Sequence, residues 1–260
     1  MKKWLTKQGS EIYRVLRKGS NAYLISTNQK YILVDTGYQS SYTKLIQNIR
    51  SLKLEKSTID TLILTHTHFD HCRNAFSIKR DFGSRIIMSE YECPNAIAGY
   101  TLLPKGTFRI TRLLSNLGNA IGKKLFGYHS FSADTCITDR YDLNNEGLGI
   151  QLMKTNGHST GSISVIVDNE IAIVGDAMLG RFKWTIFPPF ADNVDEMISS
   201  WGELLETECN TFLPGHGNEI KRELLQKQYL KYRYGSAHRP ANSRSKIVQM
   251  NNNLDDSYQV

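Results

Sequence analysis

The sequence predicts a single domain built from mixed α and β layers. Its 260 residues are enough for one large core. Short runs rich in β-branched and aromatic residues alternate with segments of helical periodicity, and no internal repeat or linker divides them. With 40% hydrophobic and 22% charged residues, the composition is that of an ordinary globular protein. It excludes a disordered, collagen-like or coiled-coil chain.

The first third of the chain predicts strands and one helix. Three short β-rich runs are expected as strands, at residues 12–16, 21–26 and 31–35, the last two joined by a turn at 27–30. A helix follows, because apolar residues recur at helical spacing from Leu45 to Leu52. Residues 60–65 then form a buried type of strand that leads directly into a cluster of histidines.

The middle of the chain is harder to assign. After a strand at 84–88, about 60 residues show one clear feature, an apolar stripe made of Ile110, Leu113, Leu114, Leu117, Ile121 and Leu125. The stripe predicts an amphipathic helix that packs against the core. A lid over a substrate pocket and a homodimer surface are the alternatives. A membrane-surface helix is disfavoured, because only four basic residues accompany the stripe.

The last third predicts strands at 149–155, 162–167 and 171–174, a helix at 194–205, a short strand at 211–213 and a helix at 218–233. We therefore expect one domain at residues 1–235, with an insertion at about 90–145. The polar stretch 236–260 is expected to be a C-terminal tail.

The net charge of +7 is concentrated near the two ends of the chain. Residues 19–219 carry 18 basic and 21 acidic side chains, whereas nucleic-acid enzymes usually carry basic residues across the binding face. We therefore expect a small-molecule substrate and no nucleic-acid partner.

Two further features indicate the compartment. The chain has no apolar run long enough for a membrane helix, and no apolar stretch of a secretory signal follows the first lysines, so no membrane partner is expected. The four cysteines are scattered and form no CxxC motif. These features predict reduced thiols and a cytoplasmic location.

Three histidines and an aspartate fall within six residues, in the run His66-Thr67-His68-Phe69-Asp70-His71. In an extended segment alternate side chains point the same way, so His66 and His68 can hold one metal ion together. Once the chain turns, Asp70 and His71 can face a second position. Imidazole and carboxylate donors suit zinc or iron.

Three more candidate ligands occur in short loops after predicted strands: His158 in Asn156-Gly157-His158-Ser159, Asp176 in Val174-Gly175-Asp176-Ala177, and His216 in Pro214-Gly215-His216-Gly217. A glycine precedes each of them and permits a tight turn that brings the backbone close to a metal.

Taken together, these motifs resemble those of the metallo-β-lactamase fold superfamily, and Asp35-Thr36-Gly37 resembles the strand-end motif found early in that superfamily. The resemblance implies an αββα sandwich of two mixed β-sheets flanked by helices, with a dinuclear metal site at one edge. It assigns His66, His68 and His158 to one metal, and Asp70, His71 and His216 to the other, with Asp176 bridging both.

Such a site has a definite chemistry. Two divalent ions about 3.5–4 Å apart can share a water and lower its pKa, which produces a bridging hydroxide. Zinc is the expected metal, with iron or manganese as alternatives. Asp70 is expected to be catalytic by orienting the attacking water as well as binding metal. Asp35 is expected to support the ligands through hydrogen bonds.

The pattern also points to a branch of the superfamily. The lactamases generally lack the bridging aspartate, whereas thioesterases, lactonases and nucleases keep it, so Asp176 favours a thioesterase- or lactonase-like hydrolase. We expect attack on a thioester, a lactone or another carboxylic ester. The alternatives are an iron-dependent persulfide dioxygenase-like oxidoreductase and a metal-dependent phosphodiesterase or nuclease.

One local departure from the pattern follows His71, where Cys72-Arg73-Asn74 replaces the glycine pair of many relatives. Cys72 is expected to be a small buried residue, with a redox-sensitive or metal-contacting thiol as the alternative.

Overall fold

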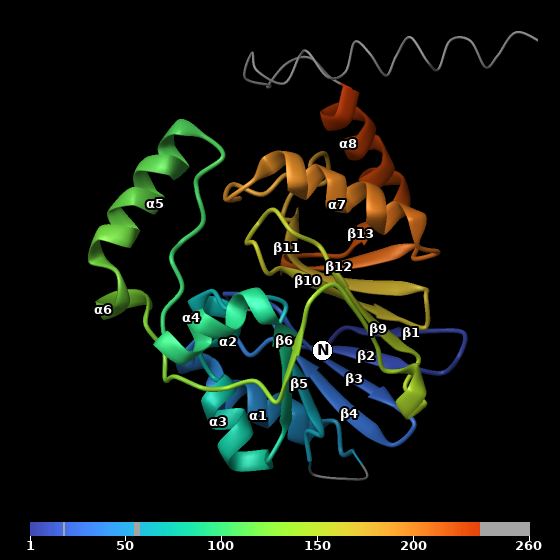
Figure 1. Cartoon of the computed structure of the whole chain (residues 1–260). Helices are drawn as coiled ribbons and strands as arrows, with labels where there is room; N and C mark the ends of the chain where they lie inside the picture. Colours follow the sequence, from blue (N-terminus) through green and yellow to red (C-terminus); the bar gives the residue numbers. More distant parts are fainter. Residues whose placement is uncertain (18, 55–57, 235–260) are drawn as a thin grey trace, which may run out of the picture.

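A computed structural model describes residues 1–17, 19–54 and 58–234 of the chain. The predicted tail at 236–260 lies outside the described residues. Two β-sheets face each other with helices on their outer faces, so the expected αββα sandwich is confirmed (Figure 1).

The first sheet has seven strands among the described residues, in the order β1-β2-β3-β4-β5-β6-β7. Their bounds are β1 Lys3–Leu5, β2 Glu11–Leu16, β3 Ala22–Thr27, β4 Lys30–Val34, β5 Thr61–Ile63, β6 Arg85–Ser89 and β7 Thr135–Ile137. Strands β1 to β4 form an antiparallel meander, whereas β4 to β7 pair in parallel. The parallel half brings the ends of β4 and β5 to one edge, where the Asp35 and His66–His71 motifs begin.

The second sheet has six strands among the described residues, in the order β13-β12-β11-β10-β9-β8. Their bounds are β8 Arg140–Asp142, β9 Ile150–Lys154, β10 Ile163–Val167, β11 Ile171–Gly180, β12 Thr211–Gly217 and β13 Ile220–Lys221. Only β11 and β12 pair in parallel here, and their register shifts at Gly175. These two strands run on through Asp176 and His216, which the sequence placed in loops.

Three apolar clusters hold the layers together. The first fills the space between the sheets, with side chains such as Ile25 from one sheet and Val165 from the other. The second lies under α1 (Tyr42–Ser51) and α3 (Ala75–Phe82) on the outer face of the first sheet. The third lies under α7 (Val194–Glu206) and α8 (Arg222–Tyr234) on the second sheet. This is the burial expected of a four-layer sandwich.

The remaining helices lie mostly in the predicted insertion: α4 Cys93–Ala98, α5 Arg109–Ile121 and α6 Lys123–Phe126, with α2 Phe69–Cys72 inside the histidine motif. Short 3-10 turns occur at η1 Gln39–Ser41, η2 Glu90–Glu92 and η3 Asn144–Glu146. Figure 1 shows α5 and α6 on the flank of the molecule, apart from the helices that cover the sheets.

The expected α5 helix forms, but the expectation that its apolar stripe packs against the core is wrong. The stripe is exposed, and the buried residues are Ser115 and Gly118 on another face. That face is occupied by the chain just before the helix: Ser115 Oγ donates to the Pro104 carbonyl at 2.8 Å, and Asn119 Nδ2 to the Leu103 carbonyl at 3.1 Å. These polar anchors turn the stripe outward.

The expectation of reduced thiols also needs correction. Cys93, at the start of α4, forms a disulfide with Cys136 in β7. The parallel pairing of β6 with β7 brings these segments together, across a sequence separation of 43 residues that no local motif reveals. Cys72 and Cys209 are free and buried.

Within the described residues, none of the helices combines the length and hydropathy that spanning a bilayer requires.

Candidate metal centre

The seven candidate ligands come from four segments that meet at one end of the sandwich. His66, His68, Asp70 and His71 follow β5, and His158 lies in the turn between β9 and β10. Asp176 lies in β11 and His216 in the neighbouring parallel strand β12, and their side chains meet at 3.3 Å. The structure therefore brings together every residue that the resemblance assigned to metal.

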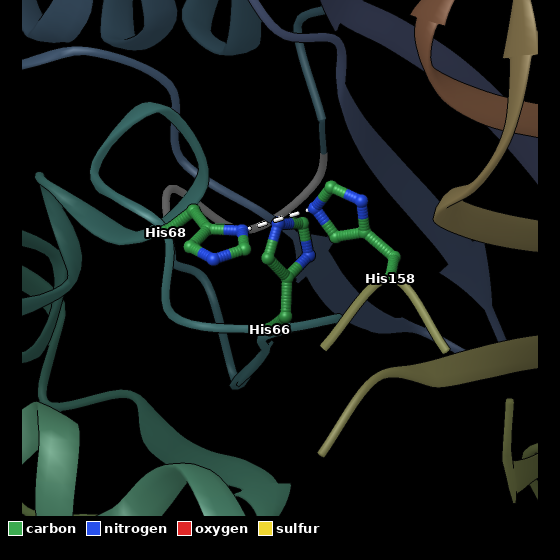
Figure 2. A group of neighbouring side chains, drawn as sticks. All are labelled: His66, His68 and His158. Atoms are coloured by element: carbon green, nitrogen blue, oxygen red, sulfur yellow. Dashed lines mark hydrogen bonds between the residues drawn. The ribbon is translucent and has the colours of Figure 1, made fainter. Parts of the chain in front are cut away.

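His66, His68 and His158 form the first half of the centre (Figure 2). One nitrogen from each lies within 4.8 Å of the others, and all three side chains are buried. His68 Nδ1 is 3.0 Å from His158 Nε2. The rings of His66 and His68 have their centroids 4.6 Å apart. Three imidazoles turned toward one point are a donor set that suits a divalent cation.

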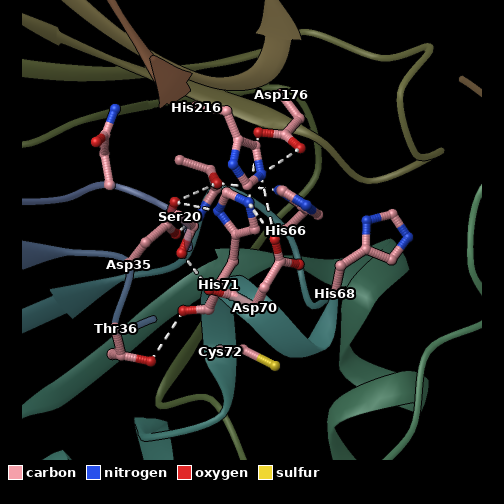
Figure 3. A network of polar contacts seen from close by, with 12 residues as sticks. Ser20, Asp35, Thr36, His66, His68, Asp70, His71, Cys72, Asp176 and His216 are labelled. Atoms are coloured by element: carbon pink, nitrogen blue, oxygen red, sulfur yellow. Dashed lines mark hydrogen bonds and ion pairs between the residues drawn. The ribbon is translucent and has the colours of Figure 1, made fainter. Parts of the chain in front are cut away.

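Asp70, His71 and His216 form the second half (Figure 3). His216 Nε2 is 3.1 Å from Asp70 Oδ2, and His71 Nε2 is 3.7 Å from the same oxygen. Solvent reaches this half more than the first, because the side chains of His216 and Asp70 are 17% and 13% exposed.

Asp176 lies between the two halves. Its carboxylate oxygens are 3.4 Å from His71 Nε2, 3.3 Å from His216 Nε2 and 3.7 Å from His158 Nε2. It is the one carboxylate among the described residues that is close to histidines of both halves, which is the position a bridging ligand needs.

Every histidine of the centre uses its second nitrogen to contact the protein. His66 Nδ1 is 3.1 Å from Thr65 Oγ1, and His71 Nδ1 is 2.8 Å from Asp35 Oδ2. The other three face backbone carbonyls: His68 Nε2 at Leu102 (3.1 Å), His158 Nδ1 at Phe190 (3.0 Å) and His216 Nδ1 at Gly19 (3.0 Å). Such contacts fix the tautomer and ring orientation of metal-binding histidines.

Buried atoms without a hydrogen-bond partner test whether a metal fits. Seven buried side-chain atoms of the described residues lack such a partner, and three of them, His66 Nε2, His71 Nε2 and Asp176 Oδ1, belong to candidate ligands and lie together. Buried polar atoms normally have partners, so three orphaned donor atoms at one place indicate that a cation completes the site. A Cβ at Gly215 would collide with Asp176 and His71, which explains the glycine before His216.

The two halves differ in charge. Burial lowers the pKa of His66 well below its usual range and that of His158 to about 4. Burial opposes protonation of His71 and His216 as well, but nearby carboxylates outweigh it, with Asp176 the strongest. They raise the pKa of His71 well above its usual range and that of His216 to about 10.

The carboxylates show the complementary effect. Burial acts to raise the pKa of Asp70 and Asp176, but the neighbouring histidines outweigh it and lower both. Both side chains are therefore ionised at neutral pH, the form that binds metal.

Asp35 supports the second half, as expected. Besides contacting His71, its Oδ1 accepts from the Thr65 backbone N–H at 2.9 Å and its Oδ2 from Thr65 Oγ1 at 2.8 Å. Its backbone has a φ of +62°, a left-handed conformation that is uncommon outside glycine. These contacts hold the residue in place at the end of β4.

Glu92 supports the first half, and sequence reasoning missed it. Its buried carboxylate accepts from the backbone N–H of Thr67 at 3.2 Å, from the Thr67 hydroxyl, and from Ser159 Oγ at 2.6 Å. It thereby ties the loop of His66 and His68 to the loop of His158. No motif marks an acidic residue in the turn after β6, so only the folded chain shows this role.

Cys72 is a buried thiol, as its main interpretation predicted. Its Sγ donates to the Thr67 carbonyl at 3.1 Å, and burial raises its pKa well above the usual range. Next to it, Arg73 donates to the carbonyls of Gly127 and Leu125 and so attaches the insertion to the histidine motif.

Comparison with known proteins is consistent with this geometry. A model of the Metallo-beta-lactamase superfamily matches residues 16–216. The chain therefore belongs to the metallo-beta-lactamase superfamily.

Among named relatives, the Beta-lactamase-like protein 2 homolog of Drosophila melanogaster is 24% identical over 86% of this chain and 70% of its own length. A probable metallo-hydrolase of Methanocaldococcus jannaschii is 27% identical over 76% of this chain and 87% of its own. The Atrochrysone carboxyl ACP thioesterase of Aspergillus fumigatus is 24% identical over 81% of this chain, which spans 57% of that protein.

Solved structures agree on the fold. A metallo-beta-lactamase mutant from Cronobacter sakazakii has a TM-score of 0.60 with 19% identity, covering 99% of both chains. TTHA1623, solved in a di-iron-bound form, has a TM-score of 0.58 with 19% identity, covering 82% of this chain and 96% of its own.

Proposed function

We propose that this protein is a dinuclear metal-dependent hydrolase of ester-type bonds: a thioester, a lactone or another carboxylic ester. One observation carries the proposal. Five imidazoles, each anchored through one nitrogen, present the other to a shared space that also contains Asp70 and Asp176.

The donor set allows two ions. His66, His68 and His158 would hold one, and Asp70, His71 and His216 the other, with Asp176 shared between them. We propose zinc, which suits nitrogen and oxygen donors, with iron or manganese as alternatives. When bound, such a pair lowers the pKa of a shared water and polarises the carbonyl of the substrate.

The side chains of the protein have their own roles in this proposal. Asp70, ionised and 13% exposed at the centre, would orient the attacking water and accept its proton. Asp176 would place negative charge between the cations and reduce their repulsion. Asp35 and Glu92 would keep the histidine rings in position.

The choice of an ester-type bond rests on the intact seven-residue set with Asp176 and on relatives named as a thioesterase and as metallo-hydrolases. A small-molecule substrate and a cytoplasmic location remain predictions from the sequence.

The test is a hydrolysis panel of acyl thioesters, lactones and carboxylic esters with the metal-loaded protein. We expect turnover of at least one class, abolished in Asp70→Asn and retained in Asp81→Asn, which changes an exposed aspartate of α3. No turnover of any ester, together with persulfide-dependent oxygen uptake by an iron-loaded protein, would replace the proposal with the dioxygenase alternative. Cleavage of phosphodiesters alone would replace it with the phosphodiesterase alternative.

A further inference from the structure

Helix α5 exposes its apolar face and buries its small and polar face, the reverse of a usual surface helix. Five apolar side chains of its stripe are each 52–70% exposed: Ile110, Leu113, Leu114, Leu117 and Ile121. The small and polar side of the helix, at Ser115, Gly118 and Asn119, packs on the preceding segment instead. A surface helix normally buries its apolar face. The exposed face of α5 therefore lacks a partner among the described residues.

Other exposed apolar side chains lie in segments next to the helix. Leu102 and Leu125, before and after α5, are 63% and 52% exposed. The loop between β11 and α7 adds Phe182 and Trp184, which are 46% and 72% exposed. This loop lies against the segment that enters α5, since Gly106 pairs with Phe190 and the Thr107 N–H donates to the Pro189 carbonyl at 3.0 Å (Figure 1).

The charges around this surface are mostly positive, and the acidic exception is Asp192, whose Oδ1 accepts from the Lys105 backbone N–H at 3.0 Å. Residues 93–133 contain five basic side chains and no Asp or Glu: Lys105, Arg109, Arg112, Lys123 and Lys124. Residues 177–191 add Arg181 and Lys183, again without an acidic residue. In the part of the chain that the structure describes, none of these seven forms an ion pair with a carboxylate. Their charges are therefore available to an external anionic surface.

A second copy of the chain fits this surface poorly. In a two-fold dimer the same patch meets itself, so the basic residues at both ends of α5 would approach their equivalents, and Asp192 alone would face seven Lys and Arg side chains of the patch. Exposed leucines, isoleucines and aromatic residues bordered by lysine and arginine match a different partner, the interface of an anionic bilayer.

We propose that α5, together with the Phe182–Trp184 loop, docks the protein on the surface of anionic lipid bilayers. The apolar stripe enters the boundary between headgroups and acyl chains, and the basic residues contact lipid phosphates. This proposal replaces the sequence-based expectation of no membrane partner, which rested on the lack of a long apolar run and on the small number of basic residues beside the stripe. The same segment reaches the metal centre through the Leu102 carbonyl beside His68, so docking brings the lipid surface close to that centre.

The experiment is co-sedimentation of the full chain with vesicles of phosphatidylcholine alone and of phosphatidylcholine mixed with phosphatidylglycerol. We expect binding to the anionic vesicles that weakens as salt is raised. The double variant Leu114→Asp/Leu117→Asp should reduce the partition coefficient by at least about tenfold. Its matched control is Leu230→Asp, an exposed leucine on α8 that should leave binding unchanged.

A second variant keeps the apolar stripe intact. Arg109→Glu/Lys124→Glu should weaken binding to anionic vesicles by about tenfold or more, whereas Lys44→Glu on α1 should not. Absence of vesicle binding, or equal binding by both double variants and the parent protein, would overturn the proposal. A dimer in sedimentation equilibrium that Leu114→Asp/Leu117→Asp dissociates, without vesicle binding, would assign the surface to a second copy instead. These readouts need no hydrolysis, so they stand apart from the proposed function.

Discussion

The two halves of the metal centre use the same side chain in opposite electrostatic settings. His66, His68 and His158 are buried among one another, and their pKa values are lowered. His71 and His216 are also buried, yet carboxylates raise their pKa values above the ordinary range. The comparison shows that imidazole alone does not define a metal site. The surrounding charges determine whether a proton must leave before a cation binds.

The largest expected effect comes from the residue that both halves share. Asp176→Asn keeps the size of the side chain and removes its charge, so the two cations would lose the ligand between them. We expect hydrolysis to fall by more than about a hundredfold, beyond the loss typical of residues that only support ligands. Initial rates and metal content measure this effect, with Asp81→Asn as the matched control. Parent-level activity would show that Asp176 does not bridge.

The supporting carboxylates separate the two halves. Glu92→Gln replaces one acceptor oxygen by a donor facing Thr67 or Ser159, and should weaken metal binding at the first half by about 10–100-fold. Asp35→Asn should do the same at the second half through His71. Titration of each metal-free variant with zinc measures both affinities. Loss of the same ion in both variants would contradict the assignment of the supports.

Proton release on metal binding provides a direct reading of the charge difference. At pH 7.5 the metal-free second half holds His71 and His216 protonated, so its loading should release about two protons. The first half should release almost none, because its histidines are already neutral. Calorimetric titration in buffers of different ionisation enthalpy counts these protons. Release of equal numbers of protons on loading the two halves would contradict the difference in charge between them.

The smallest effect is on stability without metal. The pKa of His158 is lowered to about 4, so the free energy of unfolding falls as the pH drops from about 6.5 to 4, where only the unfolded chain takes up a proton at this residue. The pKa of His216 is raised to about 10, so its contribution to the free energy of unfolding is full below about pH 6.5 and is lost as the pH rises toward 10. The urea midpoint of unfolding, measured in chelator as a function of pH, should test both statements. We expect His158→Gln to reduce the fall in the midpoint at acid pH, and His216→Gln to reduce the fall at alkaline pH. If His158→Gln changed the alkaline part of the pH dependence and His216→Gln the acid part, the pKa directions would be contradicted.

Local motifs made much of this predictable. Four of the seven candidate ligands lie in one run after β5, and each of the other three follows a glycine, so local sequence marks them as candidates. Their assignment to one dinuclear site follows from the resemblance to the metallo-β-lactamase superfamily. The role of Asp35 follows from the resemblance of Asp35-Thr36-Gly37 to the early strand-end motif of that superfamily. The main strands and α1, α5, α7 and α8 follow from hydrophobic periodicity, which is a property of neighbouring residues.

What could not be predicted depends on contacts between distant segments. Glu92 acts on two loops that are brought together only by folding, and the Cys93–Cys136 disulfide follows from the pairing of β6 with β7. Periodicity predicts that the stripe of α5 is a core face, because it identifies an apolar side of a helix without showing which residues that side contacts. Polar contacts from Ser115 and Asn119 decided its direction.

The most direct test of the central claim is the metal content per chain of the purified protein and of its His158→Gln and His216→Gln variants, measured by elemental analysis after loading with zinc. The account predicts two ions in the parent protein and one in each variant. A parent protein that takes up no metal, or a variant at either half that still holds two ions, would contradict a dinuclear centre divided in this way.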